Sequence, residues 1–300
     1  MPSGQAGTLR EVIRAATATL AQAGVASPRA DAELLAAHAA GVDRSRLAVL
    51  ELSGHRLPES DAARYHELIA ARARRVPLQH LTGIAAFGPV TLQVGPGVFV
   101  PRPETEALLE WAYGVLEHAG PSPVVVDLCT GSGALALALA QRCPGATVVA
   151  VDDSADALEY TRRNAAGTGI RIHRADVTAA GLLPELDGRV DLLVCNPPYI
   201  PEGACLEPEV VDHDPHHALF GGPDGMSVIP AVAALAGRWL VPGGAVGIEH
   251  DDTTADATVA VLHRAGVFGD IVARTDLTGR PRFVTAVRSG PDNSRREDDA

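Results

Sequence analysis

Residues 190–201 read VDLLVCNPPYIP, an apolar run that ends abruptly in Asn-Pro-Pro-Tyr. Aliphatic residues without polar alternation are typical of a buried parallel strand. Two consecutive prolines cannot continue a hydrogen-bonded ladder, so we expect the strand to stop at Asn196. Open α/β sheets bind their ligands at the carboxyl ends of the strands. The stretch therefore predicts a binding site around Asn196.

The residues after this strand favour a ligand that donates hydrogen bonds. Pro197 and Pro198 have no N–H, so their backbone offers only carbonyl acceptors, and the Asn196 side-chain oxygen can turn the same way. A planar NH2 group has two hydrogens to give, and Tyr199 can stack on it and exclude water. The alternative is a proline-rich turn in which Asn196 is only a cap.

A second predicted strand leads into a glycine turn. Residues 124–137 read VVVDLCTGSGALAL, which indicates a strand, a turn and the start of a helix. Gly131 and Gly133 let the backbone approach a ligand at the N-terminus of that helix. The turn is not a Walker loop, because it lacks Gly-Lys-Ser/Thr, and it is not the dinucleotide G-x-G-x-x-G pattern, because Leu135 and Ala136 follow Gly133.

Two more predicted strands end in acidic residues. The strand at 147–151 ends in Asp152, which is placed to accept hydrogen bonds from a ribose diol, with Asp153 as the alternative. The strand at 170–175 ends at Asp176, beside an expected adenine pocket. Further strands are predicted at 245–249, 268–275 and 282–287, with helices between the strands. This alternation predicts a doubly wound, mostly parallel α/β sheet.

The N-terminal part of the chain differs in pattern. Helices are predicted from Thr8, with Glu11 completing a capping box, from Ser27-Pro28, and over 44–50 and 61–75. Residues 77–83 (PLQHLTG) read as linker, and alternation within 85–100 predicts a β-hairpin. We therefore expect a helical domain at 1–78, a second domain at 79–288 with the hairpin (84–100) as link, and a disordered tail at 289–300.

Composition narrows the functional classes. The 300 residues carry a net charge of −12, and every basic residue apart from histidine is arginine. Residues 1–80 sum to +2 and the remainder to −14, which argues against broad nucleic-acid or membrane-surface binding. The four cysteines lack CxxC spacing and predict free thiols in a reducing cytoplasm. No signal peptide and no membrane-spanning run is evident.

Three segments allow two interpretations. Arg102 in PRPETE (101–106) either pairs with a neighbouring Glu or belongs to a loop folded over a cofactor. The basic run at 72–75 is expected to be a solvated face near a helix C-terminus, with a patch for an acidic partner as the alternative. Residues 201–224 are expected to be an irregular loop beside the pocket. Its histidines (His213, His216, His217) lack a regular metal-ligand spacing, so no metal is expected.

Together these motifs resemble the class I S-adenosylmethionine-dependent methyltransferases that act on planar amino nitrogens. The narrower resemblance is to the peptide chain release factor glutamine N5-methyltransferases. It rests on the following stretches: PLQHLTG (77–83), VFVPRPETE (98–106), DLCTGSGALALALA (127–140), NPPYIP (196–201), PHHALFGGPDG (215–225) and GRPRF (279–283). NPPY alone is shared with DNA adenine and some RNA methyltransferases, whereas its combination with PRPETE is specific.

The resemblance implies a seven-stranded, Rossmann-like sheet and a glutamine methyltransferase that supports translation termination. S-adenosylmethionine, with S-adenosylhomocysteine as product, would bind to Cys129, Thr130, Gly131, Ser132, Gly133, Asp152, Asp176, Val177 and Asn196. The substrate amide would meet Asn196, Pro197, Pro198 and Tyr199, of which Asn196, Pro197 and Tyr199 are the expected catalytic residues. The helical domain would dock a class I release factor. We expect a cytoplasmic monomer.

Three positions depart from the family pattern. Cys129 and Asp251 stand where glycine is common, and Val177 stands where some members place an aromatic residue near the adenine. The alternative function is a nucleic-acid amino methyltransferase that acts on adenine N6 or guanine N2. It would need a basic groove, which a region with a charge of −14 does not favour. A non-catalytic binding module is a third class, which the intact NPPY and Gly-x-Gly argue against.

Overall fold

The computed structural model describes residues 7–290, and its chain forms two units. The first unit extends to Ile84 and also contains Glu207–His213, and the second contains Ala85–Leu206 and the chain from Asp214 onward. Of the predicted tail (289–300), all but the first two residues lie outside the described part. Within residues 7–290, no helix is both long and apolar enough to cross a membrane.

The first unit is helical, as the sequence predicts. Its helices are α1 (Leu9–Gln22), α2 (Pro28–Ala39), α3 (Arg44–Leu52), α4 (Glu59–Ala73), α5 (Leu78–Thr82) and α9 (Pro208–His213). The predicted capping box is present, since the Glu11 carboxylate accepts the Thr8 N–H at 2.8 Å. Buried side chains of α1, α2 and α4 form one core that includes Ile13, Leu35 and Tyr65.

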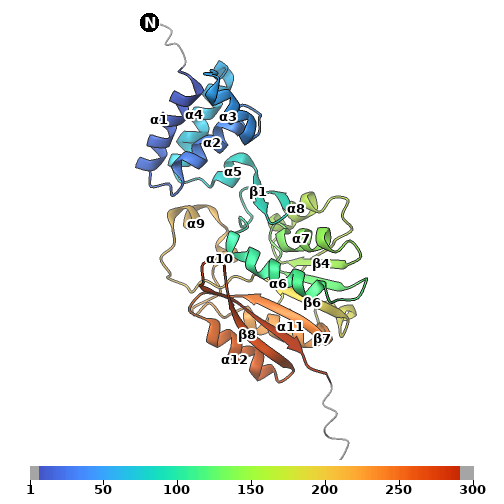
Figure 1. Cartoon of the computed structure of the whole chain (residues 1–300). Helices are drawn as coiled ribbons and strands as arrows, with labels where there is room; N and C mark the ends of the chain where they lie inside the picture. The colour runs from blue at the N-terminus through green and yellow to red at the C-terminus, as the bar shows by residue number, and fades with distance from the viewer. Residues whose placement is uncertain (1–6, 291–300) are drawn as a thin grey trace, which may run out of the picture. The chain divides into compact units, whose positions relative to one another are not determined.

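The second unit contains a two-stranded hairpin and a seven-stranded sheet (Figure 1). The hairpin pairs β1 (Ile84–Phe87) with β2 (Val90–Gln93). The sheet has the order β5-β4-β3-β6-β7-β9-β8. Its strands are β3 (Val124–Leu128), β4 (Thr147–Asp152), β5 (Arg171–Arg174), β6 (Val190–Cys195), β7 (Leu240–Glu249), β8 (Phe268–Thr275) and β9 (Pro281–Arg288). Neighbours from β5 through β7 are parallel, and β9 is antiparallel to both β7 and β8. The predicted fold class is confirmed.

Helices cover both faces of this sheet because successive strand residues point to opposite sides. Val125 packs in a cluster with α6 (Glu106–Leu116), α7 (Ala134–Arg142) and α8 (Ala155–Asn164). Val126 packs on the other face with α11 (Ile229–Trp239) and α12 (Ala255–Ala265). Two short 3-10 turns, η1 (Pro103–Thr105) and η2 (Pro184–Leu186), complete the described elements together with α10 (His216–Leu219).

The strand register brings three strand ends to one edge. Leu128 of β3 is level with Val151 of β4 and with Cys195 of β6. The next residues, Cys129, Asp152 and Asn196, therefore follow the ends of three adjacent parallel strands. After β3 the chain moves outward to β4 and β5 and then returns to β6 on the other side, so this edge is the topological switch point of the sheet.

Two predicted loop segments contain helices instead. Residues 78–82 of the expected linker form α5, which ends at Gly83 with a φ of 75°. The expected irregular loop at 201–224 contains α9 and α10, and α9 belongs to the helical unit. Short helices of this kind have weak sequence signals because most of their stability comes from tertiary packing.

The predicted solvated face at residues 72–75 is wrong for Arg72. Arg72 is only 6% exposed, and its guanidinium donates to Asp31 at 2.7 Å and to Glu209 of α9 at 2.8 Å. Arg74 does contact the helix end as expected, since it donates to the Ala70 carbonyl at 3.1 Å. The sequence could not show that a partner for Arg72 arrives from a distant segment.

Candidate active site

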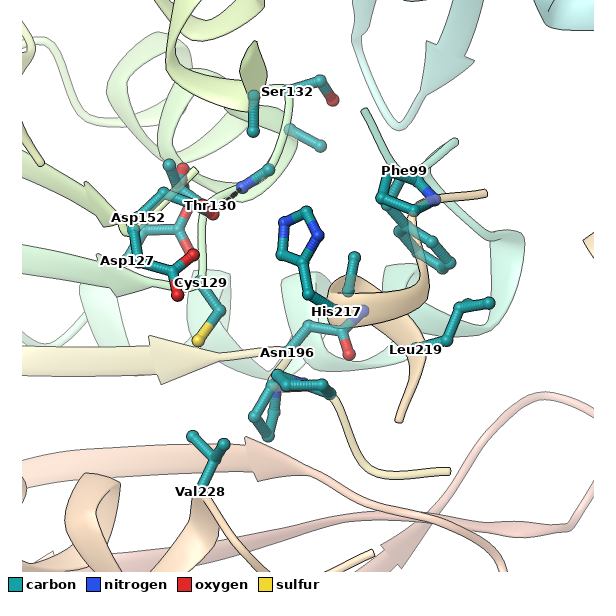
Figure 2. Close-up of a pocket in the computed structure, with 18 of the residues that line it drawn as sticks. Phe99, Asp127, Cys129, Thr130, Ser132, Asp152, Asn196, His217, Leu219 and Val228 are labelled. Atoms are coloured by element: carbon teal, nitrogen blue, oxygen red, sulfur yellow. Dashed lines mark hydrogen bonds between the residues drawn. The ribbon is translucent and has the colours of Figure 1, made fainter. Parts of the chain in front are cut away.

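One cavity lies at the carboxyl ends of β3, β4 and β6 (Figure 2). It is lined by most of the residues that the sequence singled out. These are Cys129, Thr130, Gly131, Ser132, Asp152, Asp176, Val177, Asn196, Pro197, Pro198 and Tyr199. Gly133 does not line it, but begins α7 with a φ of 88° and lies against Leu137 and Thr161. The roles of these residues toward a cofactor and a substrate remain predictions.

The turn after β3 is held by hydrogen bonds from its own backbone. The Thr130 N–H donates to the Val151 carbonyl at 3.1 Å, and the Gly133 N–H donates to the Thr130 carbonyl at 2.9 Å. Gly131 adopts a φ of 57°, a left-handed conformation that glycine reaches at little cost. Cys129 has the same φ of 57° although it carries a Cβ, which explains physically why glycine would suit this position.

Asp127 is a pocket residue that the sequence reasoning missed. Its Oδ2 accepts the Thr130 hydroxyl at 2.5 Å and the Ala136 N–H at 3.0 Å, while its Oδ1 has no hydrogen-bond partner among residues 7–290. Burial raises the pKa of Asp127 to about 7, against these hydrogen bonds, and the charge of Asp152 adds to the increase. The available signal was a carboxylate inside the apolar strand VVVDL.

Asp152 connects the second strand end to the glycine turn. Its Oδ2 accepts the Gly131 N–H at 2.9 Å, and its Oδ1 accepts the Ser154 N–H at 2.9 Å. Burial raises the pKa of Asp152, and these two backbone bonds oppose the increase. Each carboxylate oxygen has a further lone pair, so Asp152 can still accept a bond from a diol. Asp153 also lines the cavity and is exposed.

Asn196, which follows the end of β6, lines the cavity together with the residues that follow β3 and β4. Its Nδ2 donates to the Thr105 hydroxyl oxygen at 3.1 Å, and its Oδ1 accepts no hydrogen bond from residues 7–290. The Tyr199 hydroxyl donates to Oε1 of the buried Glu249 at 2.8 Å. Pro197 and Pro198 lie between these two anchored residues and line the cavity with them.

A glycine-rich segment supports the backbone of this loop. The Ile200 N–H donates to the Leu219 carbonyl at 2.9 Å, and the Gly221 N–H donates to the Ile200 carbonyl at 3.0 Å. Gly225 has a φ of 75°, and a Cβ there would lie 2.2 Å from the Tyr199 carbonyl oxygen. Only glycine allows so close an approach, which gives the FGGPDG stretch a structural reason.

The PRPETE segment contributes to the cavity, but not through the pairing considered from sequence. Arg102 forms an ion pair with Asp214, whose side chain is 1% exposed, and stacks over the Phe99 ring at 5.0 Å. Neither neighbouring glutamate is its partner in the described contacts. Phe99, Pro101 and Thr105 line the cavity. Phe99 and Thr105 are further pocket residues that sequence reasoning did not single out.

The three histidines are separated by the fold. His213 belongs to α9 in the helical unit, whereas His216 and His217 are on α10 in the sheet unit. His217 points into the cavity, towards the space between Asp152 and Asn196 in the view of Figure 2. Within residues 7–290, no group of three His, Cys, Asp or Glu side chains could hold a metal ion.

The cavity lining is compatible with the parts of S-adenosylmethionine. Among residues 7–290 the buried Oδ1 of Asp127 has no partner, and such an acceptor could bind an ammonium group. A Cβ on Gly131 would meet nothing within 4 Å, so space is open beside the turn, and Asp152 can accept bonds from a ribose. Val177 and Val228 line the cavity and could contact a flat ring. The donor set is therefore compatible with this cofactor.

Two regions of the chain match known domain families. Residues 11–83 match the PrmC N-terminal domain, and residues 104–213 match the methyltransferase small domain. Among solved structures, the hMettl16 catalytic domain in complex with MAT2A 3'UTR hairpin 6 is 15% identical. That alignment covers 76% of this chain and 83% of that chain with a TM-score of 0.52, which is a likeness of fold.

Curated relatives align with nearly the whole chain. The release factor glutamine methyltransferase of Mycolicibacterium smegmatis is 65% identical over 280 residues, which cover 93% of this chain and 98% of that protein. The protein of the same name from Mycobacterium tuberculosis is 60% identical over 287 residues, which cover 94% and 92%. Identity at this level over this length places the present chain among them: it belongs to the release factor glutamine methyltransferase family.

Proposed function

We propose that this protein transfers a methyl group from S-adenosylmethionine to the side-chain amide nitrogen (N5) of the glutamine in the Gly-Gly-Gln motif of class I peptide chain release factors. The observation that carries the proposal is one cavity in which the glycine turn after β3 and the Asn196 amide after β6 face a common space. Such a cavity can hold a methyl donor and a planar amide together. The names of the close relatives support the same reaction.

The residues after β3 and β4 would hold the cofactor. The backbone of 129–131 and the Asp127 carboxylate would bind the methionine part, Asp152 the ribose, and Asp176 with Val177 the adenine side of the pocket. When bound, S-adenosylmethionine supplies an electrophilic methyl group on a positively charged sulfur. The acidic walls of the cavity suit a cationic ligand.

The residues after β6 would hold the substrate. An amide nitrogen is a weak nucleophile because its lone pair is delocalised, so orientation must contribute much of the rate. The Asn196 Oδ1 and the Pro197 carbonyl accept the two N–H hydrogens and aim the nitrogen into the cavity. Tyr199 packs against the flat amide and excludes water. After transfer the nitrogen is acidic, and its extra proton passes to solvent.

The first experiment measures label transfer from methyl-labelled S-adenosylmethionine to a purified class I release factor. The matched control is the same factor with the Gln of Gly-Gly-Gln changed to Ala. We expect label on the first substrate and none on the second. Equal labelling of both factors would contradict the assigned position.

Parallel reactions with DNA and RNA test the alternative chemistry of a nucleic-acid amino methyltransferase. Label on nucleic acid but on neither factor would overturn the protein substrate and leave the pocket assignment intact. Release factors act where translation ends, so the proposed reaction takes place in the cytoplasm. The helical unit, with the matching N-terminal domain family, is the part that we assign to release-factor docking.

A further inference from the structure

Two polar residues that line the cavity, Asn196 and Tyr199, are each hydrogen-bonded to a buried polar side chain. Asn196 donates through Nδ2 to the Thr105 hydroxyl oxygen at 3.1 Å. Tyr199 donates to Oε1 of Glu249 at 2.8 Å. Thr105 is 4% exposed and Glu249 is 1% exposed, so water cannot replace these contacts. The two hydrogen bonds thus bring together polar groups from three distant segments.

The orientation of the Asn196 amide decides what the cavity can bind. An asparagine side chain has an acceptor on one side and a donor on the other, and a half-turn exchanges them. With Nδ2 toward Thr105, Oδ1 is available to accept a hydrogen from a substrate NH2. With the amide reversed, the Asn196 NH2 would meet the substrate NH2, and the two donors would repel each other.

Thr105 permits only the first orientation if its own hydrogen is used elsewhere. A threonine hydroxyl has one hydrogen to donate and lone pairs to accept. When that hydrogen points away from Asn196, the oxygen can only accept, and Nδ2 is the only donor of the amide. The orientation of Asn196 thus depends on a partner for the Thr105 hydrogen.

Glu249 supplies that partner. Its Oε1 takes the Tyr199 hydrogen, and its buried Oε2 has no partner of full hydrogen-bond geometry among residues 7–290. Burial raises the pKa of Glu249 to about 7, and hydrogen bonding from the Tyr199 and Thr105 hydroxyls and the positive charge of Arg282 oppose the increase. An unpartnered buried carboxylate oxygen is costly, and a hydrogen bond from the Thr105 hydroxyl would satisfy it.

We propose that Thr105 and Glu249 are positioning residues: the Glu249 carboxylate takes the Thr105 hydrogen, and Thr105 then holds the Asn196 amide with its oxygen toward the substrate. The proposal rests on the proposed function, because it assumes a substrate that donates hydrogen from a planar NH2 group. It assigns a role to the threonine of PRPETE and to the acid that ends β7, and both act through Asn196.

The test compares Thr105→Val with Thr105→Ser. Valine keeps the shape of threonine and removes the hydroxyl, whereas serine keeps the hydroxyl. We expect kcat for the release factor to fall about 30- to 100-fold in Thr105→Val, because valine leaves the Asn196 Nδ2 without its acceptor and the amide turns away from the productive orientation. Thr105→Ser should stay within about threefold of the wild type. The dissociation constant of S-adenosylhomocysteine should change less than about threefold in both, since neither change touches the glycine turn.

A double-mutant cycle separates positioning from general damage. If Thr105 acts through Asn196, adding Thr105→Val to a protein that already carries Asn196→Ala should lower kcat by less than about threefold. A multiplicative loss in the double variant would overturn the proposal, as would full activity of Thr105→Val. Glu249→Gln provides a second variant. The glutamine NH2 can donate to the Thr105 hydroxyl oxygen, and the Thr105 hydrogen can then point to Asn196 and favour the reversed amide. We expect this variant to lower kcat by a similar factor.

Hydrogen exchange of the Asn196 side chain tests its orientation without any methyl transfer. One Nδ2 proton of Asn196 should exchange slowly with solvent in the ligand-free wild type and in Thr105→Ser, and rapidly in Thr105→Val. The resonance is assigned by its loss in Asn196→Ala. Fast exchange in all forms would overturn the proposal even if the enzyme is active. If Nδ2 exchanges slowly in a wild-type protein that methylates no release factor, the positioning of Asn196 by Thr105 is supported and the proposed substrate is rejected.

Discussion

The helical unit and the sheet unit both bury carboxylates, but the surroundings of these carboxylates differ. In the helical unit, buried Asp31 is paired with Arg72, whose guanidinium also binds Glu209 and the Val76 carbonyl. In the sheet unit, Asp127, which lines the cavity, and Glu249, which binds the Tyr199 hydroxyl, each keep one buried oxygen without a hydrogen bond among the described residues. The Asp31 carboxylate stabilises the helical core through its ion pair. The free oxygens of Asp127 and Glu249 can accept a hydrogen bond from a ligand or from a neighbouring hydroxyl.

This difference has an energetic consequence. Burial raises the pKa of Asp127 and of Glu249 to about 7, so ionising them in the folded protein costs free energy. A site prepared for a cationic ligand is therefore less stable before the ligand binds. The helical unit has no such need, and its buried charges are neutralised locally.

The largest effect is expected from breaking the pair in the helical unit. Arg72→Met removes the cation from a buried Asp31 and should destabilise the unit by about 3 to 5 kcal/mol. Hydrogen exchange of the α2 and α4 amides in the full chain measures the loss. The matched control, Arg72→Met with Asp31→Leu, removes both charges and should recover most of the stability. A single variant as stable as the wild type would contradict the comparison.

The next effect concerns catalysis at the cavity. Asn196→Ala should lower the turnover with a release factor about 10²- to 10³-fold, or about 3 to 4 kcal/mol, because the amide nitrogen loses a fixed acceptor. Calorimetric titration with S-adenosylhomocysteine should give an affinity within about threefold of the wild type. Near-normal turnover would remove Asn196 from the mechanism.

A smaller effect is expected from neutralising the unpaired carboxylate of β3. Asp127→Asn should weaken S-adenosylmethionine binding by about 10- to 100-fold. A hydrogen bond to a charged group usually contributes about 1.5 to 3 kcal/mol, which corresponds to this range. Titration of the cofactor measures this. An unchanged dissociation constant would mean that Oδ1 does not contact the ligand.

The same variant should alter the pH dependence of stability. The pKa of Asp127 is about 7 when folded against an ordinary value of 3.8, so the folded state binds more protons between these pH values. Stability of the ligand-free wild type therefore falls as pH rises from about 4 to 7. Asp127→Asn should flatten this slope and unfold at a higher temperature than the wild type at pH 8. The raised pKa of Glu249 remains and leaves part of the slope.

The smallest effect concerns backbone strain at the cavity. Cys129 has a φ of 57°, which costs a residue with a Cβ about 1 to 2 kcal/mol. Cys129→Gly should be more stable than Cys129→Ala by about 1 kcal/mol, since both lose the thiol and only glycine relieves the strain. Thermal unfolding of the two variants side by side measures the difference. An alanine variant of equal or greater stability would show that the turn is not strained.

Much of the fold was predictable because its signals are short-range. Apolar runs such as 124–128 and 190–195, proline pairs and glycine turns act on neighbouring backbone, so strand ends and the helix after Gly133 were located from sequence. The short helices α5, α9 and α10 were missed because they depend on packing with distant segments. The expected charge pattern at Arg72 failed for the same reason.

The sequence by itself determined the sheet, its strand ends, the glycine turn and the acceptor-rich loop at Asn196, because each depends on local backbone geometry. Only the tertiary structure decided which side chains meet behind them. Thr105 and Asn196 are 91 residues apart, Tyr199 and Glu249 are 50 apart, and Arg72 and Glu209 are 137 apart. No periodicity or spacing relates such pairs. Their contacts arise when parallel strands end at one edge and when a returning segment joins a helical core.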